Sequence, residues 1–171
     1  AYTDRKGFND KARAEAWKHQ TIAYRKAGVS GLCPWTPVSV TGELDFDEDL
    51  LFKTQKAAYE PVAAFIRERH TRTFCGRNLV RTFDVFNDSV SHRKLWVRWA
   101  LFRDQRQPAL DGGGEFIELG PAENGDVAIS FSVPDVEYRT RLTLKWLLFS
   151  DTEFVLQGQQ AIDVFPDRPI K

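Results

Sequence analysis

The sequence predicts an α+β chain in which a helical segment, residues 1–60, precedes an antiparallel β-sandwich formed by residues 61–171. Within residues 1–60, small and apolar side chains recur at helical spacings of three and four. From Pro61 onward, apolar residues instead recur at every second position, as they do in half-buried strands. Short sequences rich in glycine, asparagine and aspartate separate these alternating stretches, which indicates turns.

The composition indicates a globular protein and argues against several classes of partner. Of the 171 residues, 42% are hydrophobic and 13% aromatic, and the 24 basic and 24 acidic side chains cancel. Because nucleic-acid-binding proteins usually carry a basic excess, we expect no nucleic acid. No apolar run approaches the roughly 20 residues of a membrane helix, and no secretion signal is recognisable, so we expect no membrane. The lack of any methionine, even at position 1, indicates a processed chain or one cut from something longer.

Residues 9–28 carry the signals of a helix. Asn9 or Asp10 can cap its first turn, and Gly28 stands where a left-handed residue commonly ends a helix. One face consists mostly of small side chains, which would allow close packing against a sheet. Its members are Ala12, Ala16, His19, Ala23 and Ala27.

A buried strand and a second helix are expected next. Residues 29–35 form a short apolar run ahead of the loop 37–46, which predicts the strand. Asp45 and Glu48 have the spacing of a capping box, and Pro61 prevents the helix from continuing past about Tyr59. Helix, strand and helix in this order are a fragment of an α/β architecture, because a single strand cannot form a sheet.

Seven short strands are expected after Pro61. Leu95, Val97 and Trp99, which alternate with Trp96 and Arg98, show the pattern most clearly. The predicted strands are 62–69, 79–87, 95–101, 116–119, 127–133, 142–148 and 154–165, and the predicted turns are 75–78, 87–89, 112–114, 124–125 and 150–151. Strands of this number and spacing predict an immunoglobulin-like antiparallel β-sandwich, although the Cys–Trp–Cys pattern of antibody domains is absent.

The sequence shows no metal-binding, phosphate-binding or nucleophile motif. The histidines at positions 19, 70 and 92 lack the paired spacing of zinc ligands, and the glycines at 112–114 lack the lysine of a phosphate-binding loop. Cys33 and Cys75 have no CxxC spacing, so two free buried thiols are favoured over a bridge. We therefore expect no metal and no cofactor.

Two charged clusters are interpreted as ordinary surface. Residues 67–72, together with Arg77 and Arg81, form a basic run, which in a domain without net charge indicates a solvated sheet face. Asp45, Asp47, Glu48 and Asp49 could suggest a pair of glycosidase carboxylates. Acidic residues are, however, favoured at a helix start by the helix dipole.

Trp35 is the candidate ligand-binding residue. It follows the predicted buried strand directly, and ligand-binding groups of α/β barrels lie at the C-terminal ends of strands. An exposed tryptophan there offers a flat apolar face of the kind that stacks on a sugar ring. A core tryptophan packed under the sandwich explains the same spacing equally well.

Three stretches, AGVSGLCPWT at 27–36, QKAAYEPV at 55–62 and VFNDS at 85–89, resemble the C-terminal part of glycoside hydrolase family 2-type enzymes, the β-galactosidase/β-glucuronidase clan. In that family a catalytic (β/α) barrel ends with a tryptophan-bearing strand and a last helix, and a β-sandwich follows. The resemblance implies that residues 1–60 are the helix-strand-helix end of a TIM-type barrel and that 61–171 support it. It also implies that Trp35 forms a wall of a sugar subsite.

The resemblance further implies that this chain alone is inactive. The family hydrolyses β-glycosides with retention by means of two glutamates, and both would lie upstream of Ala1. Neither Glu43 nor Glu48 matches a catalytic position. The implied partners are a carbohydrate, bound through the parent barrel, and the rest of that barrel or a neighbouring chain, covering a strand edge. The sugar and linkage stay open, and a periplasmic or extracellular location is favoured over a cytoplasmic one.

A stand-alone β-sandwich module that binds a glycan or a protein is the alternative, and a scaffold without ligand is a third possibility. A binding module should present exposed aromatic side chains in one patch, for which Trp96 and Phe102 are the candidates. A barrel fragment should instead expose Ala12, Ala16 and Ala23, together with one strand edge. A scaffold should bind no sugar.

Overall fold

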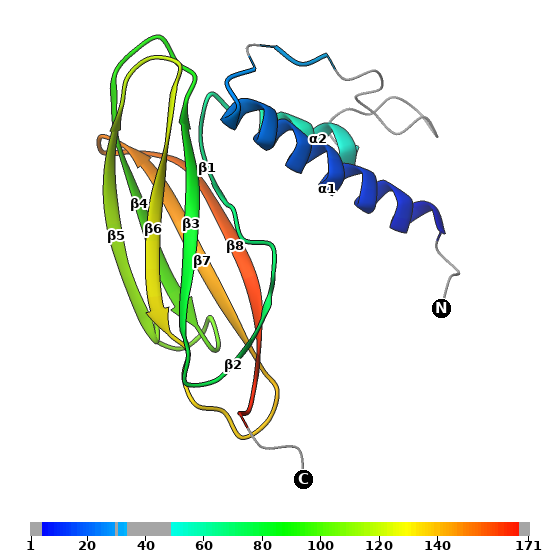
Figure 1. Ribbon diagram of the computed structural model, residues 1–171, viewed down its shortest axis with the longest axis vertical. Coiled ribbons are helices and arrows are strands. Elements are labelled where there is room, and N and C mark those ends of the chain that lie inside the picture. Colours follow the sequence, from blue (N-terminus) through cyan, green and yellow to red (C-terminus); the bar gives the residue numbers. More distant parts are fainter. Residues whose placement is uncertain (1–4, 30, 34–48, 168–171) are drawn as a thin grey trace. The chain divides into compact units, whose positions relative to one another are not determined.

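The computed structural model describes residues 5–29, 31–33 and 49–167 of the chain (Figure 1). The chain divides into two compact units, Ala1–Glu60 and Pro61–Lys171, each with its own internal packing. In its described part the first unit is helical, and the second consists of strands.

The first unit contains the helices α1 (Arg5–Lys26) and α2 (Leu50–Ala58). The expected start of α1 at residues 9–10 was wrong, because the helix begins at Arg5 and continues through Gly7 despite the low helix propensity of glycine. Gly28 has a φ of +75°, so the predicted left-handed glycine after this helix is confirmed. Asp49 is the N-cap of α2, and its carboxylate accepts a hydrogen bond of 2.8 Å from the backbone N–H of Phe52.

The two helices contact each other through a small buried interface. Thr21 donates a hydrogen bond of 3.1 Å from its hydroxyl to the side-chain oxygen of Gln55, and both side chains are buried. Arg25 donates to the backbone carbonyls of Ala58 and Glu60, at 2.6 and 2.9 Å. A cation is favourable at this place because the carbonyls at a helix C-terminus carry partial negative charge.

The predicted small-residue face of α1 is not the face that is buried. Among residues 9–26 of this helix Ala14 and Thr21 are buried, whereas Ala12, Ala16 and Ala23 are exposed. Small side chains therefore mark the outside of α1 in this chain.

The described part of the predicted strand 29–35 forms no strand. Val29 and residues 31–33 have no ladder partner in the described part of the chain, and Val29 and Leu32 are exposed. A strand is stable only when a neighbour exchanges backbone hydrogen bonds with it. Trp35 and the predicted capping-box residues, 45 and 48, lie outside the described residues.

The second unit is a sandwich of two sheets, with strand orders β1-β3-β6 and β2-β8-β7-β4-β5 (Figure 1). The strands are β1 (Val62–Ile66), β2 (Arg72–Phe74), β3 (Asn78–Asn87), β4 (Arg93–Phe102), β5 (Asp111–Leu119), β6 (Glu123–Ser132), β7 (Thr140–Ser150) and β8 (Glu153–Phe165). All paired neighbours are antiparallel except β2 and β8. The predicted α+β organisation, with an antiparallel β-sandwich, is confirmed.

The grouping of the strands is that of an immunoglobulin-like sandwich. In that arrangement the second and fifth strands share one sheet, and the third, sixth and seventh share the other. If β1 and β2 are counted together as the first strand, divided between the sheets, then β3 and β6 are the second and fifth strands and share the three-stranded sheet. The third, sixth and seventh strands are then β4, β7 and β8, which share the five-stranded sheet. The segment between β1 and β2 therefore crosses from one sheet to the other.

Several strand boundaries differ from the prediction. Residues 112–114 and 124–125, predicted as turns, lie inside β5 and β6. β2 was not predicted, because its three residues are largely exposed and show no apolar alternation. The predicted turn after β2 is confirmed by Gly76, with a φ of +70°, and the turn after β7 by Asp151, with a φ of +56°.

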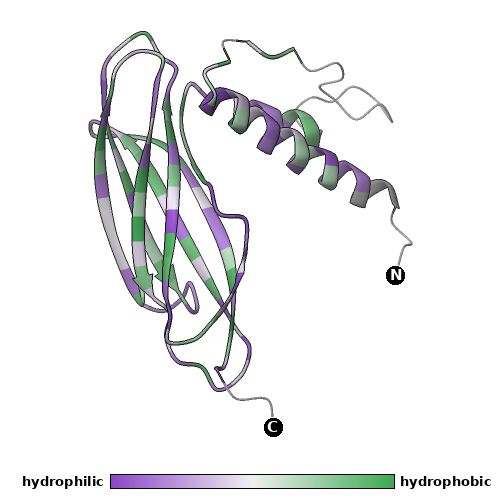
Figure 2. Ribbon diagram, in the orientation of Figure 1, coloured by the Kyte–Doolittle hydropathy of each residue, from purple (hydrophilic) through white to green (hydrophobic). Residues whose placement is uncertain are grey.

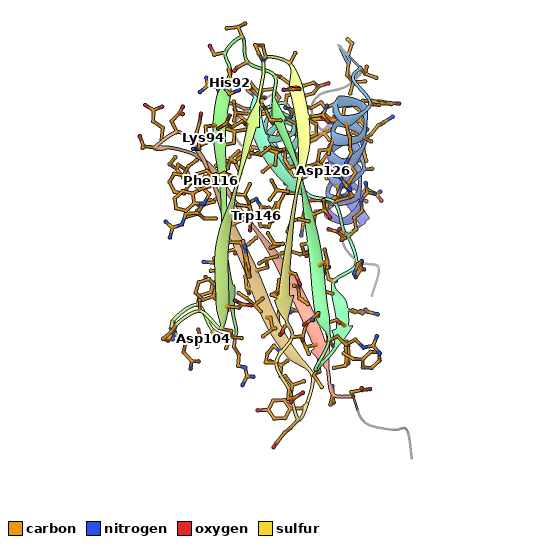
Figure 3. The ribbon with its side chains drawn as sticks, turned by 60° about the vertical axis from the view of Figure 1, so that its left-hand side comes forward. His92, Lys94, Asp104, Phe116, Asp126 and Trp146 are labelled. Carbon is orange, nitrogen blue, oxygen red and sulfur yellow. The ribbon has the colours of Figure 1, made fainter. Side chains whose placement is uncertain are left out.

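The core lies between the two sheets and is formed by the side chains of every second residue along each strand. Figure 2 shows this as alternating hydrophobic and hydrophilic bands along the strands. Trp146 lies between the sheets (Figure 3) with its ring edge against Phe83, at a centroid distance of 5.5 Å. Its indole N–H is buried without an acceptor in the described part of the chain. Packing alone therefore holds this side chain in place.

Gly158 is predicted to be essential for that packing. A Cβ at this position would overlap the indole ring of Trp146, so Gly158→Ala should lower the free energy of unfolding by about 1–3 kcal/mol. Gly120→Ala is the control, because a Cβ there meets only the flexible carboxylate of Glu123, and it should change stability by less than about 0.5 kcal/mol. Urea denaturation followed by tryptophan fluorescence measures both, and equal losses would contradict the prediction.

Candidate functional site

Four aromatic side chains form a row across the outer face of the five-stranded sheet. The register pairs Phe116 of β5 with Trp96 of β4, Trp96 with Phe149 of β7, and Phe149 with Phe154 of β8. Directly paired residues point to the same face of a sheet, and Trp96 points away from the core because its neighbours in β4 are fully buried. We call these four residues the aromatic row.

Adjacent rings of the aromatic row contact one another. Trp96 and Phe116 are stacked, with centroids 5.2 Å apart and planes at 9°. Phe149 lies 5.9 Å from Trp96 and 6.1 Å from Phe154, in tilted and edge-on arrangements. Phe116 and Phe154, at the two ends, are each 57% exposed. Together with Leu147, which lies beside it on β7, this continuous aromatic surface forms an apolar patch on the outer face and makes it a candidate binding site.

Cationic and amide side chains border the aromatic row. The ammonium of Lys94 lies 5.1 Å from the ring centre of Phe116, and the guanidinium of Arg98 lies 4.8 Å from that of Trp96. Figure 3 shows Lys94 and Phe116 on the outer side of the sheet. On β8, Gln157 lies on the same face beside the aromatic row, where the register aligns it with Leu147 of β7 and Arg98 of β4. Hydrogen-bond donors and acceptors therefore lie beside an apolar strip.

Two backbone features position the aromatic row. A Cβ at Gly114 would overlap the indole nitrogen of Trp96, so the indole lies over a stretch of β5 that has no side chain. The register of β7 and β8 shifts between Leu148 and Phe149, which indicates a β-bulge. The extra residue of β8 brings Phe154, rather than Val155, opposite Phe149 on the outer face.

The predicted site residues have different outcomes. The role of Trp35 remains a prediction, because this residue lies outside the described ones. Trp96 belongs to the aromatic row, whereas Phe102 lies farther along β4, where it pairs with Thr143 and has the ammonium of Lys145 5.9 Å from its ring centre. The other three rings of the row were not predicted as site residues. Alternation within a strand predicts which face each ring occupies, but only the register between strands brings the rings together.

Within the described residues, no three His, Cys, Asp or Glu side chains are grouped closely enough to hold a metal ion. Cys33 and Cys75 are free, as predicted, but neither is buried: Cys33 is exposed and Cys75 is half-buried. The imidazole of His19 lies 3.5 Å from the carboxylate of Glu15, one helical turn away. No helix in the described part of the chain is long and apolar enough to span a membrane.

No protein-family model and no curated protein sequence matches this chain. Among solved structures it is similar to an E. coli alpha-2-macroglobulin, with a TM-score of 0.47 and 20% identity, over 64% of this chain and 7% of that one. It is also similar to a Paenibacillus sp. cycloisomaltooligosaccharide glucanotransferase, with a TM-score of 0.43 and 18% identity, over 62% of this chain and 14% of that one. For a beta-glucuronidase from glycoside hydrolase family 2 the TM-score is 0.43 and the identity 5%, over 60% of this chain and 11% of that one.

The chain thus spans a small part of each of these proteins. Two of the three are carbohydrate-acting enzymes by name, so the distant structural neighbours include glycosidase-related proteins. At identities of 20% or less the likeness concerns the fold alone, and at TM-scores below 0.5 it carries no argument about function. The functional argument therefore rests on the chain's own residues.

The same sheet carries an ion-pair cluster formed by β8, the start of β7 and the residue before it. Asp163 accepts hydrogen bonds from the guanidinium of Arg139, at 2.6 Å, and from that of Arg141, at 3.0 Å. The bond from Arg141, followed by that from Arg139, lowers the pKa of Asp163 below its ordinary value. Ionised Asp163 is therefore the stabilised form in the folded protein.

This cluster predicts a pH dependence with a definite sign. Because the pKa of Asp163 is lowered by folding, its stabilising contribution is present above the ordinary aspartate pKa of about 4 and is lost as the pH falls through the lowered value. A carboxyl-carbon NMR titration should give Asp163 a pKa below the ordinary value. Arg141→Gln should raise that pKa. A pKa in the unaltered chain at or above the ordinary value would contradict the prediction.

Proposed function

We propose that the β-sandwich binds carbohydrate on the aromatic row. The observation that carries this proposal is the register, which aligns four aromatic rings across β5, β4, β7 and β8. Sugar rings present flat apolar faces formed by C–H groups, and aromatic rings are the side chains that stack on them. An extended glycan would cross the strands along this row and contact the exposed edges of Phe116 and Trp96, because these two rings stack on each other and Lys94 and Arg98 lie over them.

The surroundings of the aromatic row favour a glycan over a protein partner. The apolar strip is one residue wide on β4, β5 and β8 and is widened by Leu147 on β7, whereas protein interfaces have a broad apolar centre. Arg98 and Gln157 follow it directly on the same face, and Lys94 borders it on the other side. Such side chains can hydrogen-bond the hydroxyl groups at the edges of a sugar ring while the faces stack.

The finer proposal is that the chain is a piece of a retaining β-glycoside hydrolase of the family 2 type. It is supported by the sequence resemblance and by the exposure of Ala12, Ala16 and Ala23 on α1, as expected for a barrel helix without its neighbours. On this proposal residues 1–60 are the end of the TIM-type barrel, and Trp35 is a wall of its sugar subsite. The catalytic glutamates, and the remaining barrel as partner, belong to the parent protein.

The aromatic row is predicted to bind soluble β-linked hexasaccharides of glucose, xylose, mannose or galactose. Binding by at least one member of this panel should be measurable by calorimetry, with a change in tryptophan fluorescence. Phe116→Ala should weaken this binding about 5- to 30-fold, since one aromatic ring contributes on the order of 1–2 kcal/mol. Tyr138→Ala is the matched control, because this exposed aromatic side chain lies outside the aromatic row. This variant should bind the oligosaccharide with unchanged affinity.

Gly114→Ala provides a second test of the same site without removing a ring. The added methyl group would displace the indole of Trp96 from its place over β5 and should weaken binding by a similar factor. If no member of the panel binds, or if Tyr138→Ala weakens binding as much as Phe116→Ala, the proposal is wrong.

The chain on its own is predicted not to hydrolyse nitrophenyl β-glycosides of glucose, galactose or glucuronic acid. A retaining mechanism needs two carboxylates about 5–5.5 Å apart, flanking the scissile bond, and the resemblance places both upstream of Ala1. Release of nitrophenol is the measurement, with buffer alone as the baseline. Turnover above that baseline that co-purifies with the chain would contradict the fragment proposal but would leave the binding proposal intact.

A further inference from the structure

A cavity of about 620 Å³ opens where β2 joins the edge of the five-stranded sheet. Its walls come from the end of the crossing segment, β2, the start of β3 and the end of β8. The volume lies within the range of about 300–1,000 Å³ that small-molecule sites occupy. The aromatic row is elsewhere on this sheet and shares no residue with the cavity.

The walls of the cavity are cationic and contain no carboxylate. His70, Arg72 and Arg77 line it. Within the described residues, the guanidinium groups of Arg72 and Arg77 have no carboxylate partner; that of Arg77 lies over the ring of Phe74, 5.1 Å from its centre. Asp163, which pairs with Arg72 in the register, has its two oxygens held by other arginines. The cavity therefore offers two guanidinium groups with unused donors.

Two phenyl rings complete the cavity. Phe74 and Phe165 are paired in the register of β2 and β8, with centroids 6.5 Å apart and planes at 58°. Phe74 is 45% exposed, although it lines a concave site. A ligand that covered this ring would remove apolar surface from water.

His70 is oriented by a buried arginine behind it. The guanidinium of Arg81 lies 3.4 Å from Nε2 of His70 and donates a hydrogen bond of 2.9 Å to its backbone carbonyl. Because a guanidinium has only donors, Nε2 must accept, and Nδ1 carries the proton in the neutral ring. The guanidinium of Arg81 is fully buried, and the nearby carboxylate of Glu68 offsets its positive charge.

We propose that this cavity binds an oxyanion, a carboxylate, sulfate or phosphate, attached to a flat ring. Arg72 and Arg77 would hold the anionic group through charge-assisted hydrogen bonds, for which the guanidinium fork is well shaped. The ring of the ligand would lie against the parts of Phe74 and Phe165 that Arg77 and Arg139 leave uncovered. This site does not depend on carbohydrate binding at the aromatic row, so either proposal can fail while the other stands.

The test is a titration of the full chain with benzoate, phenyl sulfate, phenyl phosphate and inorganic phosphate, with benzyl alcohol as the uncharged analogue. At least one phenyl anion should shift the Arg Nε–H signals of Arg72 and Arg77 in NMR spectra, and benzyl alcohol should not. Arg72→Gln and Arg77→Gln should each weaken that binding about tenfold. Arg103→Gln, on the β4–β5 loop at the opposite edge of the sheet, should leave it unchanged.

The arms of the titration identify which anion is preferred and whether the ring matters. Phe74→Leu should weaken the binding of phenyl phosphate and leave the binding of inorganic phosphate unaffected. The proposal is overturned if no phenyl anion binds at concentrations up to about 10 mM. It is also overturned if benzyl alcohol binds as tightly, or if Arg103→Gln weakens binding as much as Arg77→Gln, which would indicate only non-specific charge attraction.

Discussion

The buried guanidinium of Arg81 holds the crossing between the two sheets in place. It donates hydrogen bonds to Gln160 on β8, at 2.8 Å, and to the carbonyl of His70, and Gln160 in turn donates to the carbonyl of Glu68. Burying a cation is very unfavourable unless its donors are satisfied, so these partners must stay where they are. The crossing segment is thereby tied to β8, and β2 lies parallel to that strand. The cavity and the edge of the five-stranded sheet both depend on this arrangement.

The aromatic row and the core constrain each other through the two-residue period of the strands. In β4 the side chains before and after Trp96 enter the core, so a one-residue slip would bury the polar face and expose the apolar one. Packing of the core therefore fixes the register of the strands, and this register keeps the four rings of the aromatic row aligned. The sandwich thus supplies a rigid support on which exposed rings are kept aligned, which is what a preorganised binding surface requires.

The sequence predicted the strands well where burial alternates and poorly where a glycine has another role. The glycines at 112–114 suggested a turn, but they lie within β5, where Gly114 leaves room for an indole from the neighbouring strand. The basic run at 67–81 suggested one solvated face, yet its arginines have three environments. Arg67 is paired with Asp84 and Asp126, Arg81 is buried, and Arg72 and Arg77 line the cavity. The crossing between sheets separates them, and no local pattern reveals it.

The sequence by itself determined the α+β class, the change from helical to alternating periodicity at Pro61, and the face of β4 that Trp96 occupies. These properties follow from local periodicity and turn chemistry, which act over a few residues. Only the tertiary structure decided which rings share a row, which face of α1 is buried and where the guanidinium groups converge. Each of these depends on pairing between distant segments, and the hydrogen-bond register that fixes such pairing is a property of the assembled sheets.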